Sequence, residues 1–178
     1  MKMDTIRLLH FFHVLAWIFF IAMCFEAGSY MFNMIFTLGF RPLAADYFKL
    51  TDLYTFNKDY FALLLTVMTL VAVLKTLTLY RIVKIFTDRK LDLKMPFSNE
   101  FADFIFALSH FTLAIGLSSI MGMKVVEWIS DQNIFVPDAQ YLRMSGADVW
   151  LFMSAVLYVI AQIFKRGVEM QAENELTI

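Results

Sequence analysis

The chain has 178 residues, of which 60% are apolar, 17% aromatic and only 17% charged, and its formal net charge is −1. Soluble proteins carry about 25% charged residues, and a chain of this length cannot bury 20 Phe and 12 Met inside itself. The composition therefore excludes a soluble globular protein and indicates that lipid surrounds much of the surface. The near-zero net charge argues against direct nucleic-acid binding. The single Cys24 excludes an intramolecular disulfide and a Cys-rich metal site.

Charged residues are nearly absent from four long runs of the sequence. Together these runs hold 88 residues and only two charges, Glu26 and Lys75. About 20 helical residues are needed to cross the hydrocarbon layer, and backbone polar groups inside lipid need partners within their own segment. We therefore expect an all-α integral membrane four-helix bundle that forms one domain. The charge-poor runs are 8–38, 60–80, 104–123 and 149–164.

The expected helices cover approximately 8–38, 60–86, 99–123 and 147–168. They leave outer loops at 39–59 and 124–147, an inner loop at 87–98 and a tail at 169–178. The start of the third helix has a local signal, because Pro96 disfavours helix before it and Ser98 or Asn99 can cap the first turn. Glu100 then favours the positive end of the helix dipole.

The distribution of Lys and Arg predicts the orientation in the membrane. An even number of crossings puts both termini and the inner loop on one side, with nine basic residues, against five in the two outer loops. Positive charge marks the cytoplasmic side. We therefore expect both termini to be cytoplasmic.

Glu26 and Lys75 are costly in lipid and need a partner or a role. Counting ~1.5 Å per residue from the expected boundaries places Glu26 about 22 Å, and Lys75 about 9 Å, from the inner face. This separation predicts separate partners. Lys124 is the best-matched cation for Glu26, and Arg143 is another. Glu26 is then either a paired structural carboxylate or a ligand- or proton-binding group that faces an outward cavity.

For Lys75 there are two interpretations. Its long side chain can extend to the inner headgroups, or it can join a buried polar layer with His110 and Gln162, which lie at similar expected depths. His10, His13 and His110 also raise the alternative of a b-type haem held from two helices. The depths of His13 and His110 differ too much to favour it. We therefore expect no cofactor.

No catalytic or metal-binding motif is present in the sequence, so the sequence predicts a non-enzymatic protein with neither catalytic residues nor a metal site. Ala114, Ser118 and Gly122 recur every four residues and predict close helix packing. That packing is either within one bundle or between copies in a homo-oligomer. The aromatic residues of the outer loops are expected at the membrane interface; they are Tyr47, Phe48, Tyr54, Trp128, Phe135 and Tyr141.

Several fragments occur in an order typical of one family. The most specific is the chain end from Ala161 to Ile178, and four shorter fragments precede it: Phe25-Glu26-Ala27-Gly28, Asp52-Leu53-Tyr54, Lys84-Ile85-Phe86 and Pro96-Phe97-Ser98. On these residues the chain resembles a bacterial family of small four-helix membrane proteins known only as a domain of unknown function. Members are often encoded beside a helix-turn-helix regulator of the Cro/CI type.

The resemblance implies a multi-pass protein of the bacterial inner membrane that senses a signal and controls a cytoplasmic helix-turn-helix transcription factor. The tail is the expected partner-binding surface, with Lys165 and Arg166 followed by Glu169 and Glu173. An alternative is that the tail is a solvated helix end that fixes topology. A different function, as a small transporter or an immunity protein against a membrane-active compound, would use Glu26 and the outer loops.

Overall fold

The protein is all-helical in the residues that the structure, a computed structural model, describes, which are 2–40, 43–88 and 98–175. Four of the six helices in these ranges are long and apolar enough to cross a membrane. The expectation of four long apolar helices is thereby confirmed. In chain order the helices are α1 (Lys2–Gly39), α2 (Leu43–Tyr47), α3 (Thr51–Phe56), α4 (Lys58–Thr87), α5 (Asn99–Ser130) and α6 (Ala147–Glu175).

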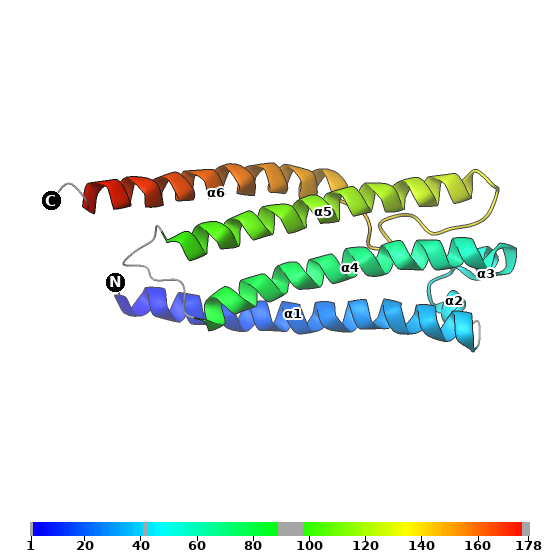
Figure 1. The fold of residues 1–178 in the computed structure, drawn as a ribbon. Coiled ribbons are helices and arrows are strands. Elements are labelled where there is room, and N and C mark those ends of the chain that lie inside the picture. Colours follow the sequence, from blue (N-terminus) through cyan, green and yellow to red (C-terminus); the bar gives the residue numbers. More distant parts are fainter. Residues whose placement is uncertain (1, 41–42, 89–97, 176–178) are drawn as a thin grey trace.

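The four long helices lie side by side in the order α1, α4, α5, α6, each antiparallel to the next (Figure 1). Each packs on its neighbour in this order, whereas no Cα atom of α1 lies within 8 Å of α5 or α6. The bundle is therefore open between its first and last helices. The start of α1 and the end of α6 lie at the same end of the bundle (Figure 1), as an even number of crossings requires.

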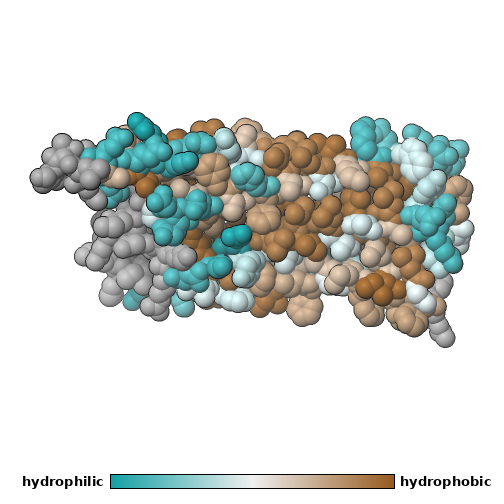
Figure 2. Space-filling model, in the orientation of Figure 1, coloured by the Kyte–Doolittle hydropathy of each residue, from teal (hydrophilic) through white to brown (hydrophobic). Residues whose placement is uncertain are grey.

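On the face that Figure 2 shows, apolar side chains dominate the middle of the bundle and polar side chains are concentrated toward its ends. Phe25 on α1 is 77% exposed and Phe152 on α6 is 69% exposed. α1 buries only a narrow stripe that includes Ala16, Ala27 and Tyr30, because among the described helices it contacts only α2 and α4. So much exposed apolar surface is stable only in contact with lipid.

Contacts between α1 and α4 fix how far one helix is shifted along the other. In each contacting pair the two residue numbers add up to 99 or 100, so the shift is the same along the whole interface. Position 26 of α1 therefore lies level with positions 73 and 74 of α4, within about two residues of Lys75. The pairs are His13 with Thr87, Phe20 with Tyr80, Met23 with Thr76, and Met34 with Thr66.

α6 begins only about halfway along α5. Leu151, in its second turn, packs against Gly116, where a Cβ atom would lie 2.8 Å from Cγ of Leu151. From Gly116, α5 continues for fourteen residues to Ser130, about 21 Å further. The segment 131–146, which contains no helix, runs back over this distance to the start of α6 (Figure 1). In the half of the bundle far from the termini it takes the place of a fourth helix (Figure 1).

Side-chain caps begin two of the long helices. Ser98 Oγ accepts a hydrogen bond from the backbone N–H of Phe101 at 3.2 Å, which confirms the expected start of the third apolar helix. Pro96 lies outside the described residues. Asn57 caps α4 by accepting from the N–H groups of Asp59 and Tyr60. Each cap satisfies amides that have no partner within the helix.

Small side chains on α5 allow close approach by its neighbours. A Cβ atom at Gly122 would lie 2.5 Å from Sδ of Met144 and 3.2 Å from Cγ1 of Val67, so this glycine packs inside the bundle. Ala114 and Ser118, which share its four-residue spacing, are only partly buried. The buried small side chains in the middle of α5 recur every three or four residues, and they are Ser109, Thr112, Gly116, Ser119 and Gly122.

Candidate functional site

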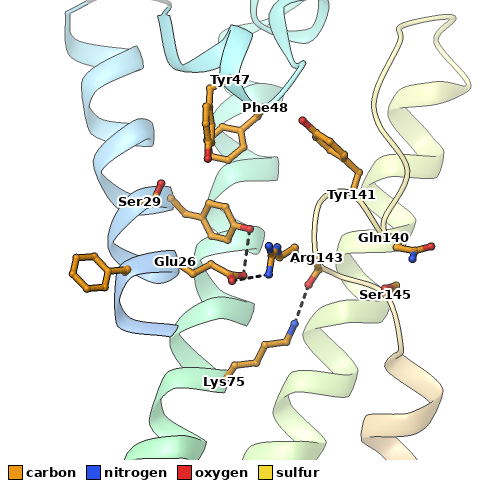
Figure 3. A pocket seen from close by; sticks show the side chains of 11 residues that line it. Glu26, Ser29, Tyr47, Phe48, Lys75, Gln140, Tyr141, Arg143 and Ser145 are labelled. Carbon is orange, nitrogen blue, oxygen red and sulfur yellow. Dashed lines mark hydrogen bonds and ion pairs between the residues drawn. The ribbon is translucent and has the colours of Figure 1, made fainter. Parts of the chain in front are cut away.

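A cavity of about 900 Å³ lies between α1, α4 and the segment that precedes α6 (Figure 3). Glu26 and Arg143 point toward each other across it, with Lys75 below them and Tyr47 and Phe48 above (Figure 3). The cavity therefore combines charged groups with an aromatic upper wall. Its lining residues are Phe25, Glu26, Ser29, Tyr30, Tyr47, Phe48, Lys75, Gln140, Tyr141, Arg143 and Ser145.

Glu26 forms an ion pair with Arg143, whose Nη1 lies 3.0 Å from Glu26 Oε2. The hydroxyl of Tyr30 donates a longer hydrogen bond, 3.4 Å, to the other carboxylate oxygen. The side chain of Glu26 is 17% exposed and that of Arg143 is 65% exposed. The carboxylate is thus held in place, while the guanidinium presents most of its surface to the cavity.

Lys124 is not the partner of Glu26, although the sequence favoured it. Its Nζ lies 2.6 Å from Glu127 Oε2, one turn along the same helix, and both side chains are largely exposed. α5 continues to Ser130 instead of ending near residue 123, so Lys124 has a helical neighbour at i+3. Arg143, the second cation considered for Glu26, makes the pair.

Lys75 points into the same cavity as Glu26. Its ammonium donates to the backbone carbonyl of Arg143 at 2.9 Å and lies 6.0 Å from the centre of the Trp150 ring. The expected depth difference of about 13 Å is wrong, because the contacts between α1 and α4 place residues 26 and 75 at nearly the same height. Lys75 also does not extend toward the end of the bundle that holds the termini, as the headgroup interpretation required, since its side chain reaches the segment that precedes α6.

A compact turn presents Arg143 to the cavity. Asp138 Oδ1 accepts from the N–H of Tyr141 at 2.8 Å, and the N–H of Met144 donates to the carbonyl of Ala139 at 2.8 Å. Buried side chains, Leu142 at 1% and Met144 at 0% exposure, anchor the turn on both sides of Arg143. Arg143 itself has φ +56°, a left-handed conformation that costs free energy for a residue with a Cβ atom.

Two aromatic residues expected at the membrane interface form the upper wall of the cavity. Phe48 is 6% exposed, and its ring centre lies 5.4 Å from that of Tyr30. Tyr47 is 68% exposed and lines the cavity, as does Tyr141, whose ring lies under Lys49 at 5.1 Å. The hydroxyl-bearing lining residues Ser29 and Tyr30 also escaped the sequence analysis. Their only signal is that they follow Glu26 by about one helical turn.

The expected polar layer of Lys75, His110 and Gln162 does not form. His110 is exposed, and its Nδ1 bonds the carbonyl of Phe106 in its own helix at 2.7 Å. Gln162 is also exposed and lies twelve residues after Trp150, the α6 residue whose ring lies beside Lys75, or about 18 Å along the helix. The three residues therefore lie at different heights.

The histidines are also poorly placed for a shared haem. His13 lies between α1 and α4, where its Nε2 is 3.2 Å from the hydroxyl of Thr87 and accepts from the indole of Trp17. His110 is on α5, which α1 does not contact. Within the described residues, no group of three or more His, Cys, Asp or Glu side chains could hold a metal ion.

A smaller charged groove lies at the opposite end of the bundle from α2 and α3. It measures about 220 Å³ and is bounded by the end of α4 and the start of α5. At the same end of the bundle, Arg166 of α6 forms an ion pair with Glu169, with 2.9 Å between Nη1 and Oε2. Two of the residues expected to bind a partner are therefore paired with each other and exposed. The groove is lined by Arg81, Lys84, Ile85, Asp88, Glu100, Asp103 and Phe104.

In comparisons with known proteins, no family model, curated protein or solved structure matches the chain.

Proposed function

We propose that the protein is a non-enzymatic sensor of the bacterial inner membrane, with both termini cytoplasmic, that binds a ligand in the Glu26–Arg143 cavity. In this proposal, occupancy of the cavity changes the position of α6, and its tail transmits the change to a cytoplasmic helix-turn-helix transcription factor. The sequence resemblance of the tail and the excess of basic residues at that end support the partner and the orientation.

The observation that carries the proposal is the direct connection between Arg143 and α6. Three residues separate Arg143 from the first residue of α6, and the helix then continues without interruption to Glu175. A ligand that competes with Glu26 for the guanidinium would pull on this short connection. A rigid helix transmits such a displacement along its length, provided that the two positions of α6 differ in ligand affinity.

The proposed output is tested by capture of the regulator. The full-length protein in lipid nanodiscs is expected to retain the helix-turn-helix regulator encoded beside its gene, and a variant that lacks residues 169–178 is expected to lose it. Lys124→Gln removes a charge at the other end of the bundle and serves as the control. Equal recovery of the regulator with and without the tail would refute the proposed surface.

The proposed input is tested by a transcriptional reporter for the same regulator. Arg143→Gln is expected to shift reporter output at unchanged protein level, because it removes the group that links the cavity to α6. Lys124→Gln is expected to leave output unchanged. If both variants behave like the wild type, the cavity does not act on the regulator.

The cavity also favours a second candidate, a small transporter or an immunity protein that binds a membrane-active compound at Glu26. For either activity, Glu26→Gln is expected to reduce flux or protection without loss of expression. Glu127→Gln, which neutralises an exposed carboxylate outside the cavity, is the matched control. Unchanged flux and protection in Glu26→Gln would exclude Glu26 from both activities.

A further inference from the structure

The cavity lies at the height of the apolar part of the bundle. Lys75 in its floor is 17 residues from the first residue of α4 and 12 from the last, about 25 Å and 18 Å along the helix. Apolar residues dominate the surface at this height (Figure 2). A ligand in the cavity therefore sits at the depth of lipid chains.

The cavity opens sideways. α4 forms its floor, α1 and the segment 140–145 form its walls, and α2 covers its outer end. On the side of the cavity that faces away from α4, a contact of α1 with α5 or α6 would be needed to close it. Among the described residues α1 makes no such contact, so this side is not closed by helices. Molecules that diffuse in the membrane can reach it from this side.

Its charges leave a formal excess of one positive charge. The lining residues include two cations, Lys75 and Arg143, and one carboxylate, Glu26. A guanidinium has five N–H donors, and Arg143 directs one of its nitrogens at Glu26 while 65% of its side chain stays exposed. Lys75 donates to a carbonyl, which carries no full charge. Positive charge within an apolar layer is stabilised by an anion.

Exposed apolar groups line the same cavity as these cations. Phe25 on α1 is 77% exposed and lines the cavity, and Tyr47 of the upper wall is 68% exposed. The cavity thus offers cationic donors for a head and aromatic surface for a chain. That combination matches an amphiphile with one negative charge.

We propose that the cavity binds an acidic phospholipid from the membrane, with its phosphodiester at Arg143 and Lys75 and an acyl chain along Phe25. The lipid phosphate competes with the carboxylate of Glu26 for the guanidinium. This inference rests on the proposed function in one respect, since it names the ligand of the same cavity.

Trp150 provides a local probe, since its ring lies 6.0 Å from the ammonium of Lys75. With Trp17→Phe and Trp128→Phe, Trp150 is the only tryptophan left in the chain. We expect brominated phosphatidylglycerol, diluted into phosphatidylcholine nanodiscs, to quench Trp150 at saturation with a clear preference over brominated phosphatidylcholine. Millimolar inorganic phosphate, the soluble source of the same chemistry, is expected not to displace it.

Substitutions in the cavity are expected to act in opposite directions. Arg143→Gln weakens phosphatidylglycerol binding about tenfold, the effect of losing one charge-assisted contact. Glu26→Gln strengthens it, because it removes the competing carboxylate. Lys124→Gln, which deletes a cation outside the cavity, leaves it unchanged. If Arg143→Gln does not fold, Lys75→Gln tests the same loss.

Three results would overturn the inference: equal quenching by the two brominated lipids, displacement by inorganic phosphate, or weaker phosphatidylglycerol binding in Glu26→Gln. The proposed function fails by a separate measurement. If the tail is still required for regulator capture while the lipid preference is absent, the sensor proposal stands and its ligand is not an acidic phospholipid.

Discussion

Gly116→Ala tests the contact that sets where α6 begins. A Cβ atom at this position would lie 2.8 Å from both Cγ and Cδ2 of Leu151 and 3.2 Å from its backbone nitrogen. Ordinary carbon contacts are about 3.5–4.0 Å, so α6 must move away by roughly 0.7–1.2 Å. The backbone of Leu151 is part of the contact, so rotation of its side chain alone cannot relieve it.

Overpacking of this kind costs about 1–3 kcal/mol. Alanine also gains helix propensity over glycine, up to about 1 kcal/mol, and this gain has to be removed by comparison. Gly28→Ala is the matched control, since it lies on α1, within a helix, with nothing within 4 Å of the added Cβ atom. We expect Gly116→Ala to be about 1–3 kcal/mol less stable than Gly28→Ala, a factor of roughly 5 to 150 in the unfolding equilibrium.

The free energies of unfolding can be compared by titrating SDS into mixed detergent micelles and following helix content by circular dichroism. If the two variants unfold within about 0.5 kcal/mol of each other, the close approach of Leu151 to Gly116 is not a constraint. The account of why α6 starts halfway along α5 would then be wrong.

Three further predictions follow from other parts of the fold. Ser98→Ala should lower the free energy of unfolding by about 1 kcal/mol, because it removes the cap on Phe101 N–H. Ser98→Asp should not, because its carboxylate can accept the same hydrogen bond. Equal loss of stability in both variants would contradict the role of the cap. Cys24, the only cysteine in the sequence, is exposed on α1 near the height of Thr76. If lipid covers it, it should resist a charged thiol reagent in vesicles and react in detergent, as measured by mass spectrometry. Modification in intact vesicles would place it in contact with water. Reporter fusions at the two termini should both be active in the cytoplasm, and opposite locations would contradict four crossings.

The long helices could be predicted from the sequence because hydrocarbon imposes a length and an absence of charge on every crossing. The same signal does not specify how far one helix is shifted along the next. That shift depends on particular contacts, such as Thr76 with the carbonyl of Met23. The expected shift of α4 along α1 was in error by about eight residues, or roughly 12 Å. This error alone placed Glu26 and Lys75 at different depths when only the sequence was considered.

The position of Arg143 depends on structure that hydropathy does not report. The segment before α6 is polar enough to be taken for an ordinary outer loop, and its return into the bundle depends on buried Leu142 and Met144. Met144 fits there because Gly122 has no side chain. Lys124 was favoured as the partner of Glu26 because the helix was expected to end at residue 123, which put Lys124 just beyond its end. The helix instead continues to Ser130.

The late start of α6 has a consequence for the surrounding bilayer. Peptide groups of the segment 131–146 lack the internal hydrogen bonds of a helix, so those without protein partners require water at a depth where lipid chains would otherwise lie. We therefore expect water to reach these peptide groups when the protein is in a bilayer. An irregular segment at this depth ties the fit of the protein to the thickness of the surrounding bilayer.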